Sequence, residues 1–154
     1  MISSVTRLNE LDKKAPIEGL AGEVHKTKNV LKAVWDFAVQ GGAVGSLLLL
    51  DDRGNPAKLP SGSIITGGLI EVITALTSTG GTGTVALTAN AAADLLAAVD
   101  ADTLSALHAL IPVGTAATAI KLTAERQITL TIATNALLTG KIAVYIDYYA
   151  GAAV

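Results

Sequence analysis

Cysteine is absent from the 154-residue chain, and histidine occurs only as His25 and His108. Without cysteine the chain can form no disulfide bond, no thiolate metal site and no cysteine nucleophile. A metal site needs three or four converging ligands, and no second ligand stands at helical or hairpin spacing from either histidine. We therefore expect no metal and no cofactor.

Sequence motifs of catalysis are missing as well. No serine lies in a Gly-x-Ser-x-Gly elbow, and the glycine-rich stretch 77–83 lacks the Gly-Lys-Ser/Thr of a phosphate-binding loop. Asp94, Asp100 and Asp102 could approach one another, but helix caps and solvated charges account for them. We expect no catalytic residue, so the sequence does not predict an enzyme.

Charged residues are scarce, at 16% of the chain compared with about 25% in typical domains. The net charge of −2 argues against nucleic-acid binding through phosphate neutralisation. Hydrophobic residues make up 51%, which together with the low charge favours an oligomer. The longest apolar run, residues 41–50, is far shorter than the ~20 residues that span a membrane. No signal peptide is visible, so we expect a soluble protein made in the cytoplasm, with no membrane partner.

Aromatic residues amount to only 3%, so Val, Leu, Ile and Ala must build the core. Trp35 and Phe37, the single Trp and Phe, share the apolar face of a predicted strand. This position predicts core packing rather than a platform for ligand stacking. Tyr145, Tyr148 and Tyr149 cluster near the end of the chain, where they either form a contact patch or close the fold.

Strand patterns are abundant. Two runs of period 2, at 127–133 and 141–149, flank a short turn containing glycine and predict a long antiparallel hairpin. Residues 44–50 carry apolar side chains on both faces, and covering both faces predicts a homotrimer. Further strands are predicted at residues 29–40, 44–50, 58–60, 63–76 with a bend at Gly67-Gly68, 84–88 and 117–122.

One helical insert is predicted between these strands. Asn90 is placed to cap a helix that runs to about Val99, and Asp102 or Thr103 to cap a second helix that ends near Leu110. Together these patterns predict an all-β fold. It is an antiparallel β-sandwich, jelly-roll-like, with one short helical insert and an extended N-terminal arm.

Residues 1–28 are predicted to form this arm, outside a β-sandwich domain of residues 29–154. Residues 1–32 carry six basic and four acidic side chains, and the arm has too few apolar residues for a core of its own. Such a segment either frays or orders against a neighbouring subunit or a larger surface. The residues expected to contact that partner are Leu8, Leu11, Lys13, Lys14, Ile17, Leu20, Lys26 and Lys28.

Three segments of the chain resemble a known group of proteins. They are VWDFAVQGGAVG at 34–45, TSTGGTGTVAL at 77–87 and TLTIATNALLTGK at 129–141. In this order they resemble small virion proteins of tailed bacteriophages, many of them from aquatic hosts. The resemblance covers residues from about 30 to 149.

The resemblance implies a capsid decoration protein, also called a cement protein. Such proteins are commonly trimers on the exterior of the icosahedral head, where they clamp neighbouring major capsid proteins against the pressure of the internal DNA. Two alternatives stay open: a head-fibre or tail-fibre module that binds a host glycan, and a cellular carbohydrate-binding sandwich. Both would normally expose aromatic side chains, which are scarce here.

Overall fold

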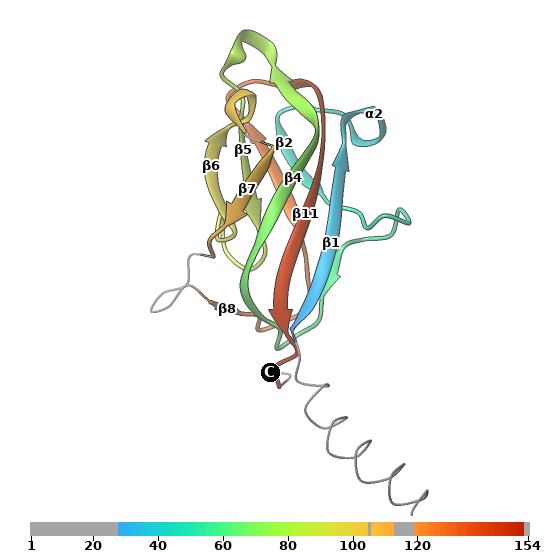
Figure 1. Ribbon diagram of the computed structural model, residues 1–154, viewed down its shortest axis with the longest axis vertical. Helices are drawn as coiled ribbons and strands as arrows, with labels where there is room; N and C mark the ends of the chain where they lie inside the picture. Colours follow the sequence, from blue (N-terminus) through green and yellow to red (C-terminus); the bar gives the residue numbers. More distant parts are fainter. Residues whose placement is uncertain (1–27, 105, 113–118, 153–154) are drawn as a thin grey trace, which may run out of the picture.

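A computed structural model describes residues 28–104, 106–112 and 119–152 of the chain. These residues form two antiparallel sheets packed face to face (Figure 1). The predicted all-β sandwich is confirmed. Two predicted features are wrong, namely the C-terminal hairpin and the helical insert.

The larger sheet has five strands in the order β1-β11-β4-β7, with β8 pairing with β4 below β7. Its central pair is formed by the two longest strands, so most backbone pairing joins segments that lie far apart in the sequence. The strands are β1 (Asn29–Asp36), β4 (Ile64–Ser78), β7 (Leu107–Leu110), β8 (Ile120–Lys121) and β11 (Leu137–Tyr149).

The smaller sheet has four strands in the order β2-β10-β5-β6. A separate two-stranded ladder, β3 with β9, lies beside the sandwich and contains the short edge segment predicted around Lys58. These strands are β2 (Gly45–Leu48), β3 (Lys58–Leu59), β5 (Thr84–Thr88), β6 (Leu96–Asp100), β9 (Arg126–Gln127) and β10 (Thr129–Ala133).

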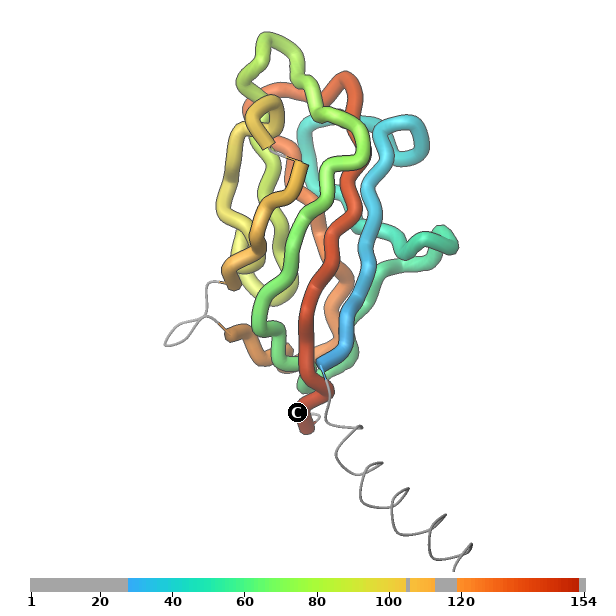
Figure 2. Tube along the Cα trace, in the orientation of Figure 1, coloured from blue at the N-terminus to red at the C-terminus, as the bar shows by residue number. Residues whose placement is uncertain are grey.

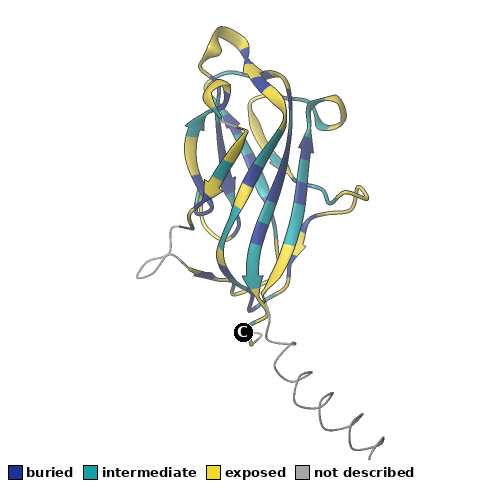
Figure 3. Cartoon of the chain, in the orientation of Figure 1, coloured by how far each residue is buried: buried dark blue, intermediate teal, exposed yellow. Residues whose placement is uncertain are grey.

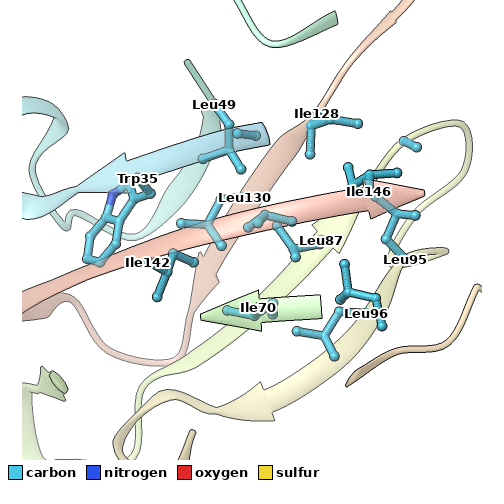
Figure 4. Packing of buried hydrophobic residues seen from close by; sticks show 14 of the residues in the cluster. Trp35, Leu49, Ile70, Leu87, Leu95, Leu96, Ile128, Leu130, Ile142 and Ile146 are labelled. Carbon is cyan, nitrogen blue, oxygen red and sulfur yellow. The ribbon is translucent and has the colours of Figure 1, made fainter. Parts of the chain in front are cut away.

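The core fills the space between the two sheets. Trp35 is fully buried there, and its indole Nε1 donates to the carbonyl oxygen of Gly41 at 3.1 Å, which confirms its predicted core role. Its neighbours are aliphatic side chains from both sheets (Figure 4). Those labelled in the figure are Leu49, Ile70, Leu87, Leu95, Leu96, Ile128, Leu130, Ile142 and Ile146.

The predicted hairpin of the C-terminal strands is wrong. β10 pairs with β2 and β5 in the smaller sheet, whereas β11 pairs with β1 and β4 in the larger one. Thr134 adopts a positive φ of 66°, and the N–H of Asn135 donates to the carbonyl of Ala133 at 2.8 Å. This tight turn carries the chain from one sheet to the other. Alternating apolar residues require a covered face, but they do not reveal which sheet a strand joins.

The predicted helical insert is also misplaced. Within residues 90–110 the structure describes β6, a 3-10 turn at Ala101–Thr103 (η2) and β7. The one α-helix among the described residues, α2 (Phe37–Gln40), follows β1 within the strand predicted at 29–40. Asp36 ends β1 because its carboxylate accepts the N–H of Ala38 at 3.0 Å and so caps α2. Alanine favours helix, but helix propensity is a weak determinant of structure, and the pairing of β6 with β5 and of β7 with β4 overrides it.

The structure has a register shift in the β4–β11 pair directly before the bend predicted at Gly67-Gly68, between Ile65 and Gly67. Gly68 has a φ of 156°, and a Cβ atom there would collide with the carbonyl oxygen of Tyr145 on β11. Only glycine permits this close approach of the two central strands. The bulge lies near the end of the sandwich at which β1 begins and β11 ends (Figure 2).

Candidate interaction surfaces

The three aspartates that could have formed a site are used structurally. Asp94 is buried, and its carboxylate accepts the N–H groups of Ala89, Asn90 and Ala91 at 2.7–2.9 Å. The carboxylate of Asp100 accepts the N–H of Asp102 at 2.9 Å, at the start of η2. Each of these groups therefore shapes a loop, and the three do not converge.

The carboxylate of Asp102 binds the end of β4. It accepts the backbone N–H of Ser78 at 3.0 Å and the hydroxyl of the same residue. The Ser78 hydroxyl in turn accepts the N–H of Gly83 at 2.7 Å. This network ties η2 to the loop between β4 and β5.

Within the described ranges, no group of three or more His, Asp or Glu residues could hold a metal ion. His108 lies on β7 opposite Ile70, within the segment predicted as a helix. His25 lies outside the described residues. Among the helices that the structure describes, none is long and apolar enough to cross a membrane.

The outer face of the larger sheet is polar on β1 and β11. Lys141 forms an ion pair with Asp36 at 3.0 Å, and Lys28 forms one with Asp147 at 3.2 Å. The hydrogen bond from Lys141 is the largest cause that lowers the pKa of Asp36 below its ordinary value of 3.8, and the bond from the Ala38 N–H is the second. These pairs give the two strands a hydrated, charged surface.

A shallow groove of about 300 Å³ crosses this polar surface beside α2. One wall is the turn after Leu50, where the Asp51 carboxylate accepts the N–H groups of Asn55 and Arg53 at 2.8 and 2.9 Å. Both bonds lower the pKa of Asp51, and the bond from the Asn55 N–H has the larger effect. The lining residues are Lys32, Val34, Asp36, Val39, Gln40, Leu50, Asp51, Asp52, Gly54, Ile73 and Lys141.

The tyrosines of β11 do not form one platform. Tyr145 donates its hydroxyl to Glu71 at 3.1 Å, and this hydrogen bond raises the pKa of the phenol. Lys32 lies over the Tyr145 ring, with its Nζ 5.9 Å from the ring centroid. Tyr148 packs against the core, and Tyr149 is exposed at the strand end. Of the two predicted roles, Tyr148 therefore helps close the sandwich, while Tyr145 and Tyr149 lie on the surface.

An apolar surface occupies the other half of the same sheet. Leu69 and Ile73 on β4 are 40% and 52% exposed, and Leu107 on β7 is 66% exposed. The register places Leu107 opposite Glu71, and therefore diagonal to Leu69 and Ile73. We call this surface the β4–β7 patch, and its residues are Leu69, Ile73, Leu107, Ala109 and Ile111. Figure 3 shows exposed positions along both strands.

The outer face of the smaller sheet has a different composition. On its four strands the only charged residue is Asp100, at the end of β6. The outward positions hold hydroxyl and methyl groups, and the Ser46 and Thr131 hydroxyls are 3.2 Å apart. We call this the uncharged face, with Asp100 opposite Thr84 at its edge, and its residues are Ser46, Leu48, Thr84, Thr88, Thr129, Thr131 and Ala133.

The predicted arm residues fall almost entirely outside the described ranges. Leu8, Leu11, Lys13, Lys14, Ile17, Leu20 and Lys26 belong to residues 1–27, for which no structure is described. Lys28 is described, and it forms the ion pair with Asp147. Sequence reasoning did not identify the β4–β7 patch or the uncharged face, because both depend on which strands become neighbours.

The fold is shared with chains from solved bacteriophage capsids. No protein-family model and no curated protein matches the sequence. A chain in the acidic stable capsid structure of Helicobacter pylori bacteriophage KHP30 has a TM-score of 0.57 and 14% identity, over 84% of this chain and 93% of that chain.

Two further capsids contain a similar chain. In the cyanophage Pam1 capsid asymmetric unit the TM-score is 0.55 and the identity 17%, over 80% of this chain and 84% of that chain. In the capsid of Ralstonia phage GP4 the TM-score is 0.54 and the identity 18%, over 81% of this chain and 86% of that chain. The chain has the same fold as proteins that form part of three different phage capsids.

Proposed function

We propose that this chain is a structural virion protein that decorates the exterior of a bacteriophage capsid and bridges neighbouring major capsid proteins. The observation that carries the proposal is the shared fold with chains of three phage capsids, which extends over at least 80% of this chain in each case. The chemistry of the described residues agrees with a non-enzymatic role, because the carboxylates of Asp94 and Asp102 accept backbone N–H groups of loops and strand ends. The protein acts as a homotrimer without a cofactor.

The arm, residues 1–28, attaches this trimer to the shell in our proposal. β1 begins and β11 ends at the same end of the sandwich, so Lys28, the last residue of the arm, lies at that end (Figure 2). Its lysines suit acidic rims on the major capsid protein, and its apolar residues gain contacts that the arm alone cannot make. Residues 29–154 then form the exposed knob.

Decoration of heads tests this proposal. Phage heads that lack the protein are incubated with the full chain or with residues 29–154, sedimented, and assayed for bound protein. We expect the full chain to bind and the truncated chain to remain in the supernatant with an unchanged melting temperature. Binding should weaken as salt increases, because lysine contacts are screened.

Two results would contradict the proposal in different ways. If neither form binds heads and antibodies find the protein on fibres, the alternative of a glycan-binding fibre module is favoured. The described groove does not support that alternative, because no aromatic side chain lines it. If the truncated chain decorates heads as well as the full chain, the anchor lies within residues 29–154.

A further inference from the structure

The strand that leads from the arm into the sandwich is held along its whole length on one side only. β1 pairs with β11 at all eight of its residues, and Asn29 at its start lies opposite Tyr148. On its other side, the pairing that the structure describes is a single bridge between Val34 and Leu50. β1 is therefore an edge strand whose attachment to the sheet depends on β11.

Side chains reinforce the attachment of β1. Lys28, directly before the strand, forms its ion pair with Asp147 of β11 at 3.2 Å. Further along the strand, Leu31 packs against the core and Trp35 is fully buried. β1 can therefore slide along β11 only if Trp35 leaves the core while the hydrogen bonds between the two strands break together.

The two ends of the larger sheet differ in how the chain passes through them. Ile64 at the start of β4 pairs with Tyr149 at the end of β11, so the chain enters β1 and leaves β11 at one end (Figure 2). Ser78 at the end of β4 pairs with Leu137 at the start of β11, at the opposite end. A pull on Lys28 away from the sandwich therefore runs along β1 when the opposite end is held. It runs across the strands when Tyr149 is held.

The direction of the pull decides how the β1–β11 pair breaks. A pull along the strands loads all the paired residues at once, so their hydrogen bonds must fail in one event. A pull across the strands opens one pair after another, beginning at Asn29, and each step breaks only the bonds of that pair. The same pairing is therefore strong in one direction and weak in the other.

We infer that the β1–β11 pair is a mechanical clamp, which resists a pull on the arm along the axis of the sandwich. The inference rests on the attachment through residues 1–28 proposed above, because a protein that bridges two shell subunits carries the force that separates them. The force enters the sandwich at Lys28 and passes directly into β1. The clamp holds when the opposing contact lies away from residues 149–152, since a contact there would open the pair from its end.

Single-molecule stretching of the full chain tests the clamp. Because the chain has no cysteine, handles attach only at introduced thiols. Ser3→Cys/Thr79→Cys holds the arm and the exposed residue directly after β4, whereas Ser3→Cys/Ala152→Cys holds the arm and the exposed C-terminal end. Each variant is mixed with excess wild-type chain, so that any trimer contains one tethered subunit. At equal pulling rates, the first unfolding event should need a severalfold higher mean force in the Thr79 variant.

Matched substitutions locate the clamp within the fold. Leu31 on β1 and Leu104 after η2 are both partly buried leucines that pack against the core. Leu31→Ala and Leu104→Ala should both lower the melting temperature. With handles at residues 3 and 79, however, only Leu31→Ala should lower the unfolding force, because it weakens the strand that must slide. Equal forces in the two pulling directions, or equal losses of force in the two leucine variants, would overturn the inference.

The outcome is separable from the proposed function. A chain that binds phage heads but unfolds at the same force in both directions would refute the clamp and leave decoration intact. A chain that shows the expected difference in force but never binds heads would refute decoration, and the directional strength of the β1–β11 pair would still stand.

Discussion

Asp94 illustrates how one buried side chain can determine the path of a loop. The sequence suggested a helix cap near this residue, and it does accept backbone N–H groups, as a cap would. It accepts three of them from the residues just before it, which closes a turn at the end of β5. The residue type was informative about its chemistry but not about the element that it serves.

Replacing Asp94 should destabilise the fold strongly. Asp94→Ala leaves the N–H groups of Ala89, Asn90 and Ala91 without their acceptor, so we expect the free energy of unfolding to fall by about 3 kcal/mol. Urea denaturation followed by circular dichroism measures it. Asp52→Ala is the control, because Asp52 is exposed and accepts no hydrogen bond from another described residue. Equal losses in the two variants would contradict this role of Asp94.

The pH dependence of stability should reflect Asp36 and Asp51. Both have a pKa below 3.8 in the folded chain, Asp36 chiefly through Lys141 and Asp51 chiefly through the Asn55 N–H. A depressed pKa stabilises the fold above the unfolded value, and this stabilisation is lost as the pH falls through the folded value. Asp36→Asn/Asp51→Asn should therefore melt at a lower temperature than wild type at about pH 7, and the difference should shrink toward about pH 2. A difference that stays constant over that range would show that these ionisations do not contribute.

At the scale of elements, strand existence was predictable and strand neighbours were not. The segments at 84–88 and 141–149 appear as β5 and within β11, because alternation of apolar and polar residues directly reports one covered face. The same alternation fits a hairpin or two facing sheets equally well. The turn between β10 and β11 has its positive φ at Thr134. Because this residue is not glycine, the sequence gives no sign of the turn.

The close approach of β4 and β11 at Gly68 provides a test at this scale. Gly68→Ala places a methyl group against the Tyr145 carbonyl, so we expect a loss of about 3 kcal/mol or more in unfolding free energy. Gly67→Ala is a close control, since the nearest atom to its new Cβ is the Leu110 carbonyl oxygen at 3.7 Å, an ordinary contact. We expect it to change stability by less than about 1 kcal/mol. Denaturant unfolding of the two variants measures the difference, and equal stability would contradict the close approach.

At the scale of the whole molecule, composition predicted an oligomer but gave no position for its contact surfaces. Low charge and abundant aliphatic residues indicated surfaces suited to protein contacts. The position of those surfaces required the pairing of β4 with β7 and of β10 with β5, which joins distant parts of the chain. The arm lies outside the described residues, so its predicted contacts stay a prediction.

The folded chain should be indifferent to metal removal. No described cluster of ligands could hold a cation, and the buried carboxylate of Asp94 already has three donors. We therefore expect the same melting temperature with and without EDTA, measured by differential scanning fluorimetry. A drop of several degrees would reveal a metal site involving residues beyond those described.

The central position of β11 also affects how the chain is made. Among the strands that the structure describes, β11 comes last in the sequence and β1 first, yet β11 lies between β1 and β4. When the ribosome has synthesised residues up to 136, neither β1 nor β4 of the nascent chain therefore has its main partner. Since long-range pairing must wait for both segments, the larger sheet can assemble only after residues 137–149 have been synthesised. A premature stop codon before β11 should yield a chain without this sheet, rather than a smaller version of the same sandwich.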